Sequence, residues 1–301
     1  MNINKNVDNE NFDNDTFNFM KNKSYSNLPV NELVNLPIFY INLDRSLDRF
    51  ELFNNQIKKY NIDPNQVTRI SAVDGKTLDV ATIKHKIHKD SKNDLPVISC
   101  MLSHFKAIKE AYESHHPYVV IMEDDCNFEY VPFQRYKLSD IANFLGETYN
   151  VIQLTTITYN YENKKLKMSP KFIIPGYKDS CVAYVINRIG MKNILDKLMD
   201  PNTEIHLADT TIYILAEQSC YLTKPYFIYF NSTITNTTIH LLSNCKYEDD
   251  NKNVWDNYYK VVPGVCDKGY IINLLNLNYT QFFISSFSVA FISIYYVFSL
   301  Y

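Results

Sequence analysis

The sequence predicts an α/β domain built on a mostly parallel sheet. Along the middle of the chain, short runs of β-branched and other apolar residues alternate with longer segments whose apolar residues recur at helical spacing. The chain has 301 residues, of which 46% are hydrophobic, and this is enough for one sizeable core. One apolar run, at 119–122, ends directly in three acids, which are costly inside a buried strand and therefore belong at its carboxyl end.

The predicted elements follow one another in alternating order. They are a strand at 36–43, a helix at 46–62, a strand at 67–75, a helix at 99–116, the apolar strand that ends at 122, a strand at 150–158, a strand continuing into a helix at 180–199, and a helix at 209–218. Ser46 is the expected N-cap of the first helix, and Gly75 the expected end of the second strand. Ligands of such sheets gather at the carboxyl ends of the strands, which is where the three acids lie.

The two ends of the chain differ from this middle region. Residues 1–35 are rich in Asn and Asp and have no periodic apolar stripe, so we expect a disordered arm. Residues 269–301 contain no charged residue, and 282–301 are about as long as a membrane span. A membrane anchor, a terminal element packed on the domain and an interfacial segment are the alternatives for this tail. The predicted domain is therefore 36–268.

Composition and cysteine spacing limit the class of partner. A formal net charge of -3 without a concentrated basic face argues against a nucleic-acid partner. The six cysteines form no CxxC pair, so their spacing indicates neither a zinc site nor a disulfide framework, and it favours buried free thiols. The N-terminal residues lack the pattern of a signal peptide. We therefore expect a cytoplasmic protein, or one attached to a membrane and facing the cytosol.

The acidic triplet Glu123, Asp124 and Asp125 is the first candidate for chemistry. In an extended segment, Glu123 and Asp125 point to one side and Asp124 to the other, so two carboxylates converge on one cation. Such oxygen ligands suit Mg²⁺ or Mn²⁺, which neutralise negative charge on a diphosphate leaving group. The alternative is a solvated loop or a helix N-terminus decorated with acids. The triplet alone does not decide between these interpretations.

Four ordered blocks resemble glycosyltransferase family 25, which includes lipooligosaccharide and procollagen galactosyltransferases. The blocks are "IFYINLDRSLDRF" at 38–50, "RISAVDGKTL" at 69–78, "SCMLSH" at 99–104 and "VVIMEDD" at 119–125, and weaker similarity continues to about 240. The resemblance implies a GT-A-like, Rossmann-related α/β/α sandwich with a mostly parallel mixed sheet. It also implies transfer, with inversion, of galactose or glucose from a uridine diphosphate sugar to a hydroxyl of a glycan or of hydroxylysine.

The resemblance gives the acidic triplet the role of the family's DxD-like motif. It implies Asp125 as first ligand of Mn²⁺ or Mg²⁺, with Glu123 as its partner or as a ribose contact. Asp124 becomes a nucleotide contact. His240, which follows the last similar block, would complete the metal shell.

The resemblance places the nucleotide pocket around "INLDRSLDR". Asn42 and Asp44 would meet the base or the ribose, and Arg45 and Arg49, four residues apart, would grip phosphate oxygens. The alternative for the two arginines is a pair of solvated surface charges. Asp74 would hydrogen-bond the nucleotide, or would serve only as a turn residue before a glycine.

Three further residues complete the implied site. Ser103 and His104 match the family's Ser-His pair on the helix before the acidic strand, although a helical histidine at an apolar position is more often a satisfied core residue. Asp209 matches the family's acid near this position and is the candidate general base for the acceptor hydroxyl. Its alternative role is that of an N-cap for the helix that follows.

Two other classes of function compete with a transferase. A non-catalytic module that binds a glycan or a partner protein would keep the fold, but it would be expected to lose one of the charged site residues, and all are present. A metal-dependent phosphohydrolase is less compatible with the sequence because no second acidic cluster supports a two-metal site.

Overall fold

The computed structural model describes the central part of the chain. The described residues are 28–83, 85–89, 94–129, 131–134, 136–155, 173–175, 180–216, 220–223 and 229–230. The predicted tail at 269–301, the candidate metal ligand His240 and residues 1–27 of the predicted arm lie outside them. Within these ranges no helix combines the length and apolar character that crossing a bilayer requires.

A seven-stranded sheet forms the centre of the described region. Its strands lie in the order β2 (Val67–Ser71), β1 (Ile38–Asn42), β4 (Tyr118–Glu123), β8 (Ala183–Asn187), β6 (Val151–Gln153), β10 (Cys220–Thr223) and β7 (Ile173–Pro175). The pairings show that β8 and β7 run opposite to the other strands, which all share one direction. The predicted mostly parallel mixed sheet is confirmed.

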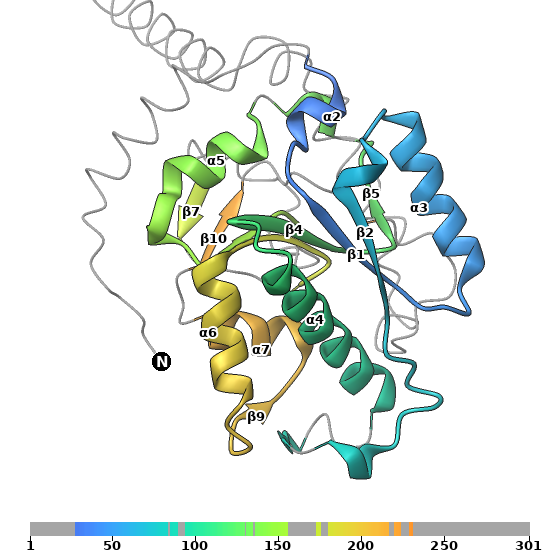
Figure 1. Cartoon of the computed structure of the whole chain (residues 1–301), viewed down its shortest axis with the longest axis vertical. Helices are drawn as coiled ribbons and strands as arrows, with labels where there is room; N and C mark the ends of the chain where they lie inside the picture. The colour runs from blue at the N-terminus through green and yellow to red at the C-terminus, as the bar shows by residue number, and fades with distance from the viewer. Residues whose placement is uncertain are drawn as a thin grey trace, which may run out of the picture.

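Helices cover both faces of this sheet, as Figure 1 shows. One face packs against α4 (Leu95–Glu113), α6 (Arg188–Leu198) and α7 (Ala208–Leu215), and the other against α2 (Val30–Leu33), α3 (Leu47–Lys59) and α5 (Leu138–Leu145). Along β4, Val119 and Ile121 pack on the face covered by α4, α6 and α7, whereas Val120 and Met122 pack on the face covered by α2, α3 and α5. This alternation follows from the pleat of a strand that is buried on both faces. The α/β/α sandwich is therefore confirmed.

Short elements complete the described structure. Two small ladders pair β3 (Lys86–Ile87) with β9 (Glu204–Ile205), and β5 (Cys126–Asn127) with β11 (Tyr229–Phe230). Short 3₁₀ helices lie at Pro64–Gln66, Val80–Thr82, Val131–Phe133 and Gly146–Thr148. The first ladder joins the loop before α4 to the loop before α7.

Element boundaries differ from prediction mainly at the second strand and the helix at 99–116. The strand predicted for 67–75 ends at Ser71, four residues before Gly75. Helix α4 begins at Leu95, because the Asp94 side chain accepts a hydrogen bond from Val97 N at 3.2 Å and so supplies the N-cap. Ser46 does occupy the N-cap position of α3, but its side chain forms no capping hydrogen bond.

The predicted disordered arm is wrong for its last residues. Residues 28–35, the part of the arm that the structure describes, contain α2, and Val30, Leu33 and Val34 are at most 4% exposed. These three apolar residues pack into the core on the α3 side of the sheet. A four-residue helix is too short to show a periodic stripe, so the sequence carries no helical signal there.

Helix α6 sits unusually close to the strand beside it. A Cβ on Gly190 would lie 2.6 Å from the backbone oxygen of Asn150, a distance that real Cβ atoms do not adopt. The Asn187 side chain, the N-cap of α6, accepts a hydrogen bond from Gly190 N at 2.7 Å, and Asn187 N donates to the same Asn150 oxygen at 3.1 Å. The start of α6 is therefore held against the end of the sheet at a separation that only glycine allows.

We expect Gly190→Ala to lower the free energy of unfolding by about 1–3 kcal/mol, because the added methyl overpacks a backbone contact. In an ordinary helix the same change would stabilise by up to about 1 kcal/mol. Urea denaturation measures the difference. Ile189→Ala, at an exposed neighbour on the same helix, is the control and should change stability by less than about 0.5 kcal/mol. A neutral or stabilising Gly190→Ala would contradict the close packing.

Candidate functional site

The candidate site lies at the carboxyl edge of the sheet, where β1 and β4 end side by side. These strands are parallel neighbours, and Ile41 of β1 pairs with Glu123 of β4. The residues that follow both strands therefore meet at one edge. Strand β8 runs the opposite way, so its beginning reaches the same edge, where Glu123 N donates a hydrogen bond to Val182 O at 2.8 Å.

Arg49 forms the centre of this edge. Its Nη2 lies 2.9 Å from Asp125 Oδ2 and forms a second, closer ion pair with Asp124. All three side chains are at most 10% exposed. Burial raises the pKa of both carboxyl groups, and Arg49 acts in the opposite direction by stabilising their charged forms. Asp124 and Asp125 are thus both paired with the positive charge of Arg49.

This arrangement corrects two geometric expectations. Glu123 and Asp125 do not converge on one point: residues 124 and 125 form a turn, so strand alternation stops at Glu123. Arg49 is not a solvated charge, because its side chain is buried and its Nη2 is paired with Asp124 and Asp125. Arg45 and Arg49 do not act as a pair, since they contact different partners.

The turn at Asp124 and Asp125, here called the acidic turn, begins a chain of hydrogen bonds that extends across β1 to β2. Asn42, which is 1% exposed, donates from Nδ2 to Asp124 Oδ2 at 2.7 Å and accepts from Arg69 Nε at 2.9 Å. Arg69 Nη2 also donates to Asp44 Oδ1 at 2.7 Å, and Ser71 Oγ donates to Asp44 Oδ2 at 2.7 Å. The predicted nucleotide-binding residues Asn42, Asp44 and Asp124 are therefore brought together. Arg69, which links them, was not predicted from the sequence.

Arg45 and Asp74 form a separate, more exposed pair beside this chain. Arg45 Nε lies 2.7 Å from Asp74 Oδ2, and the arginine side chain is 41% exposed. Asp74 also accepts a hydrogen bond from Lys76 N at 2.9 Å, which is the turn role considered for it. The bonds from Arg45 and from Lys76 N lower the pKa of Asp74 below its ordinary value.

The predicted pair Ser103 and His104 serves two different purposes. Ser103 Oγ accepts a hydrogen bond from Val73 N at 2.8 Å and donates to Ser99 O at 2.6 Å, so it ties the loop after β2 to α4. His104 is fully buried, and its Nε2 lies 3.3 Å from Glu123 Oε1. The histidine thus has a carboxylate partner, as the core-residue interpretation requires, but that carboxylate belongs to the acidic triplet.

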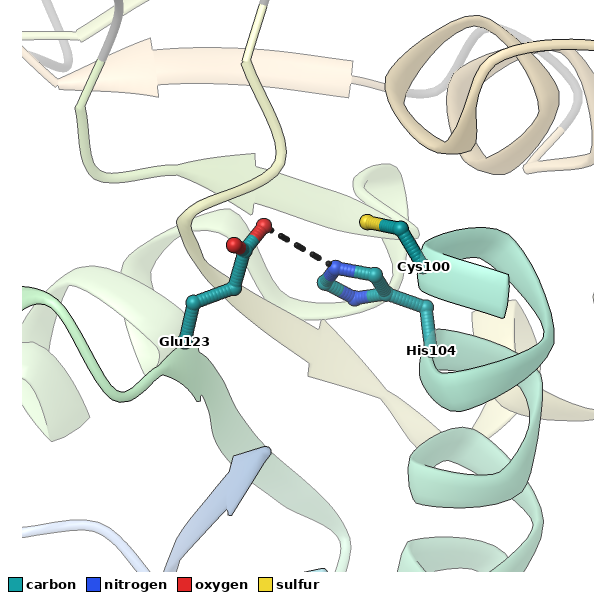
Figure 2. Close-up of side chains that lie close together, drawn as sticks. All are labelled: Cys100, His104 and Glu123. Atoms are coloured by element: carbon teal, nitrogen blue, oxygen red, sulfur yellow. Dashed lines mark hydrogen bonds and ion pairs between the residues drawn. The ribbon is translucent and has the colours of Figure 1, made fainter. Parts of the chain in front are cut away.

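Two cysteines lie next to the His104–Glu123 pair, and neither was predicted from the sequence to belong to the site. The first is Cys100, one helical turn before His104 (Figure 2). The second is Cys181, whose Sγ lies 3.4 Å from His104 Nε2. Burial acts to lower the pKa of His104, but hydrogen bonds with Cys100 and Glu123 raise it to about 9. The hydrogen bond with Cys181 lowers the pKa of Cys100 to about 7. The spacing Cys-x₃-His on a helix is the sequence signal for this cluster, and it differs from the CxxC spacing of common zinc sites.

Asp209 reaches the same edge through the loop before β8. It is the second residue of α7 rather than its N-cap, which is Leu207. Its Oδ2 accepts a hydrogen bond from Ser180 N at 3.0 Å, and its Oδ1 accepts one from Thr210 N at 2.6 Å. The N-cap alternative is therefore wrong. Asp209 holds the backbone one residue before Cys181.

Ser180 has a strained backbone at this point. Its φ is 123°, a conformation that residues other than glycine rarely adopt. In addition to the bond from its N–H to Asp209, its carbonyl accepts hydrogen bonds from Tyr213 Oη at 2.6 Å and from Gln153 Nε2 at 2.7 Å. Three hydrogen bonds, two of them buried, thus hold an unfavourable conformation in place, as is common near functional sites.

Comparison with known proteins gives the family of the chain. Residues 35–212 match the model of glycosyltransferase family 25, described as an LPS biosynthesis protein family. The chain belongs to glycosyltransferase family 25. No curated protein matches the chain. Membership of the family establishes a glycosyltransferase, which takes a nucleotide sugar and a glycan acceptor in general terms.

A divalent cation fits the acidic turn of this family 25 chain only through Asp125. Its Oδ1 is buried and has no hydrogen-bond partner among the described residues, whereas Oδ2 contacts Arg49. Both oxygens of Asp124 are engaged, by Arg49 and by Asn42. Asp125 Oδ1 is thus a hard oxygen donor of the kind that Mn²⁺ or Mg²⁺ takes.

We expect Arg49→Ala to lower the free energy of unfolding by about 3–5 kcal/mol, because it leaves two buried carboxylates without their cation. Arg45→Ala removes an arginine from a more exposed ion pair and should cost no more than about 1 kcal/mol. Urea denaturation of the two variants gives the comparison. Equal effects would show that Arg49 is a surface charge after all.

We expect Ser180→Gly to raise the free energy of unfolding by about 1 kcal/mol, because glycine adopts a positive φ without strain. The variant keeps the three backbone hydrogen bonds of residue 180 and loses the weak contact of its Oγ with Val182 N, at 3.3 Å. Thermal unfolding measures the change. Ser139→Gly, in the helical backbone of α5, is a control that should destabilise. Destabilisation of both variants alike would argue against strain at Ser180.

Proposed function

We propose that this protein is an inverting hexosyltransferase. It takes galactose or glucose from a uridine diphosphate sugar and transfers it to a hydroxyl of a glycan or of hydroxylysine. The observation that carries the proposal is the position of the acidic turn, Asp124 and Asp125, at the joined carboxyl ends of β1 and β4 in a family 25 chain. In an open α/β sheet this edge is where a nucleotide ligand binds.

The network across β1 and β2 is the proposed nucleoside site. Arg69 holds Asn42 and Asp44 in fixed positions, and the exposed Asp44 carboxylate keeps lone pairs for ribose hydroxyls. Asn42 is buried and acts by holding Asp124 in place. Asp44 is exposed, so a ligand reaches it without disturbing the core.

Arg45 replaces Arg49 as the proposed phosphate ligand. Its exposed guanidinium contacts Asp74 through Nε and Nη2, and an arginine has five N–H donors, so donors are left for phosphate oxygens. Arg49 acts instead through the acidic turn, by holding Asp124 and Asp125 in place.

A divalent cation, Mn²⁺ or Mg²⁺, is proposed to bind at Asp125 Oδ1, with His240, outside the described residues, as a further ligand. When bound, it supplies positive charge against the leaving diphosphate. Asp125 would hold the ion through Oδ1, and Arg49 fixes the direction of this carboxylate through Oδ2.

Asp209 is the proposed general base. The acceptor oxygen forms a bond to the anomeric carbon while the bond from that carbon to the diphosphate oxygen breaks, and the proton of the acceptor hydroxyl passes to the Asp209 carboxylate. Each carboxylate oxygen already accepts one backbone hydrogen bond, which fixes its direction and leaves further lone pairs for a hydroxyl.

We expect Asp209→Asn to lower kcat for sugar transfer by about 10²–10⁴-fold, because the amide takes no proton from the acceptor. The KM for the donor should stay the same. The assay incubates the protein with uridine diphosphate galactose or glucose, Mn²⁺ and a hydroxyl acceptor, and measures released uridine diphosphate and product mass. Asp196→Asn, an exposed acid on α6, is the control and should keep full activity.

Three results separate the alternatives. Full activity of Asp209→Asn would return this residue to the role of holding Ser180. A loss of activity that accompanies a large loss of thermal stability would point to the same structural role. No turnover of any nucleotide sugar, together with binding of a glycan, would identify a non-catalytic binding module and would contradict the transferase.

A further inference from the structure

A compact group of sulfur, nitrogen and oxygen donors lies beside the acidic turn. Cys100 and His104 are four residues apart on α4, so their side chains share one face of that helix. Glu123 reaches toward them from the end of β4 (Figure 2). The donor atoms of these three residues all lie within 4.8 Å of one another. Two consecutive elements, α4 and β4, thus bring three metal-binding groups close together.

The separations match those of a small tetrahedral ion. Bonds of about 2.0–2.3 Å to nitrogen, oxygen and sulfur place the ligand atoms of a tetrahedral Zn²⁺ site about 3.3–3.8 Å apart. His104 Nε2 lies 3.3 Å from Glu123 Oε1 and 3.4 Å from Cys181 Sγ. Cys181 Sγ lies 3.9 Å from Glu123 Oε1. Cys181, from the loop before β8, therefore lies beside the three donors as a candidate fourth ligand.

Tyr184 orients the histidine for such a role. Its hydroxyl lies 3.2 Å from His104 Nδ1, and the two rings stack with centroids 5.8 Å apart. When Nδ1–H donates to this hydroxyl, the Nε2 lone pair faces Glu123 and the cysteines. Metal-bound histidines are held in this way by a partner on the other ring nitrogen. An ion pair between His104 and Glu123 alone needs no partner on Nδ1, so the contact with Tyr184 favours the role of a metal ligand.

We propose that Cys100, His104, Glu123 and Cys181 form a binding site for Zn²⁺ or a similar soft divalent ion. The site joins α4 and the loop before β8 to the end of β4, next to the acidic turn. Binding of the ion at this site is independent of the proposed sugar transfer. Its thiolate and imidazole ligands select zinc over the hard ions that oxygen ligands prefer.

The proposed zinc site is separate from the proposed donor cation. Asp125 is directed to Arg49, whereas Glu123 is directed to His104, so the two acids serve different centres. An ion at the four-donor site therefore leaves Asp125 Oδ1 unchanged. The chain would hold two kinds of metal ion, one structural and one that arrives with the donor.

The experiment uses the full 301-residue chain without an affinity tag that contains histidine. The reduced protein is stripped with a chelator and titrated with Co²⁺, which reports a tetrahedral site by visible absorption and thiolate ligands by a near-ultraviolet charge-transfer band. We expect both signals to saturate at about one ion per chain, and Zn²⁺ to abolish them by displacement.

Variants test the individual ligands. Cys100→Ala and Cys181→Ala should each weaken Zn²⁺ binding by at least about tenfold, since even residues that only support a ligand have effects of this size. Cys220→Ala, at a buried cysteine on β10, is the matched control and should bind as the parent does. Asp125→Asn should also bind Zn²⁺ unchanged, although it should lose donor-dependent activity.

Several outcomes would overturn the proposal. One is a cobalt spectrum of an octahedral, oxygen-bound ion, and another is unchanged zinc affinity in both cysteine variants. If either variant fails to fold, alkylation of the parent protein decides: bound Zn²⁺ must protect half-buried Cys100, and equal modification with and without the ion contradicts the site. A disulfide between Cys100 and Cys181 in the purified protein would show a different use of these thiols.

Discussion

The buried contact of Arg49 with Asp124 and Asp125 is the constraint on which the rest of this edge depends. Two carboxylates at the end of an apolar strand must be paired, because isolated buried charges are too costly to persist. Arg49 comes from the first turns of α3, so the pairing fixes that helix against the turn. Asn42 and Arg69 then extend the ordered region to β2. The geometry offered to a ligand is set by this internal charge balance.

Much of the fold was predictable because burial on both faces leaves a strong signal. The strands at 38–42 and 183–187 are buried at every position, and such continuous apolar runs are hard to mistake in an alternating chain. Helix α2 escaped prediction because four residues cannot show a period. The start of α4 was placed too late, although Asp94 as N-cap and Pro96 in the first turn are ordinary signals of a helix start.

The sequence predicted the location of the candidate site better than the contacts between its side chains. The sequence indicated the carboxyl edge and the residues around Asn42 and Asp124, because motif and strand end coincide there. It did not indicate that Arg49 would form ion pairs with the acids, because a salt bridge between Arg49 and Asp124 depends on tertiary packing. Cys181 and Ser180 were beyond reach for the same reason: only the reversed direction of β8 brings them to this edge.

The reversed strand β8 also has a consequence for how the chain folds. Val182 closes the ladder beside Glu123, yet it follows that residue only after α5 and β6 have been made. Contacts between residues so distant in sequence carry a large loop-closure entropy, and chains rich in them fold slowly. During synthesis the acidic turn therefore emerges well before the strand that covers its flank. Until then the apolar edge of β4 stays unpaired, and such an edge is a surface that chaperones bind.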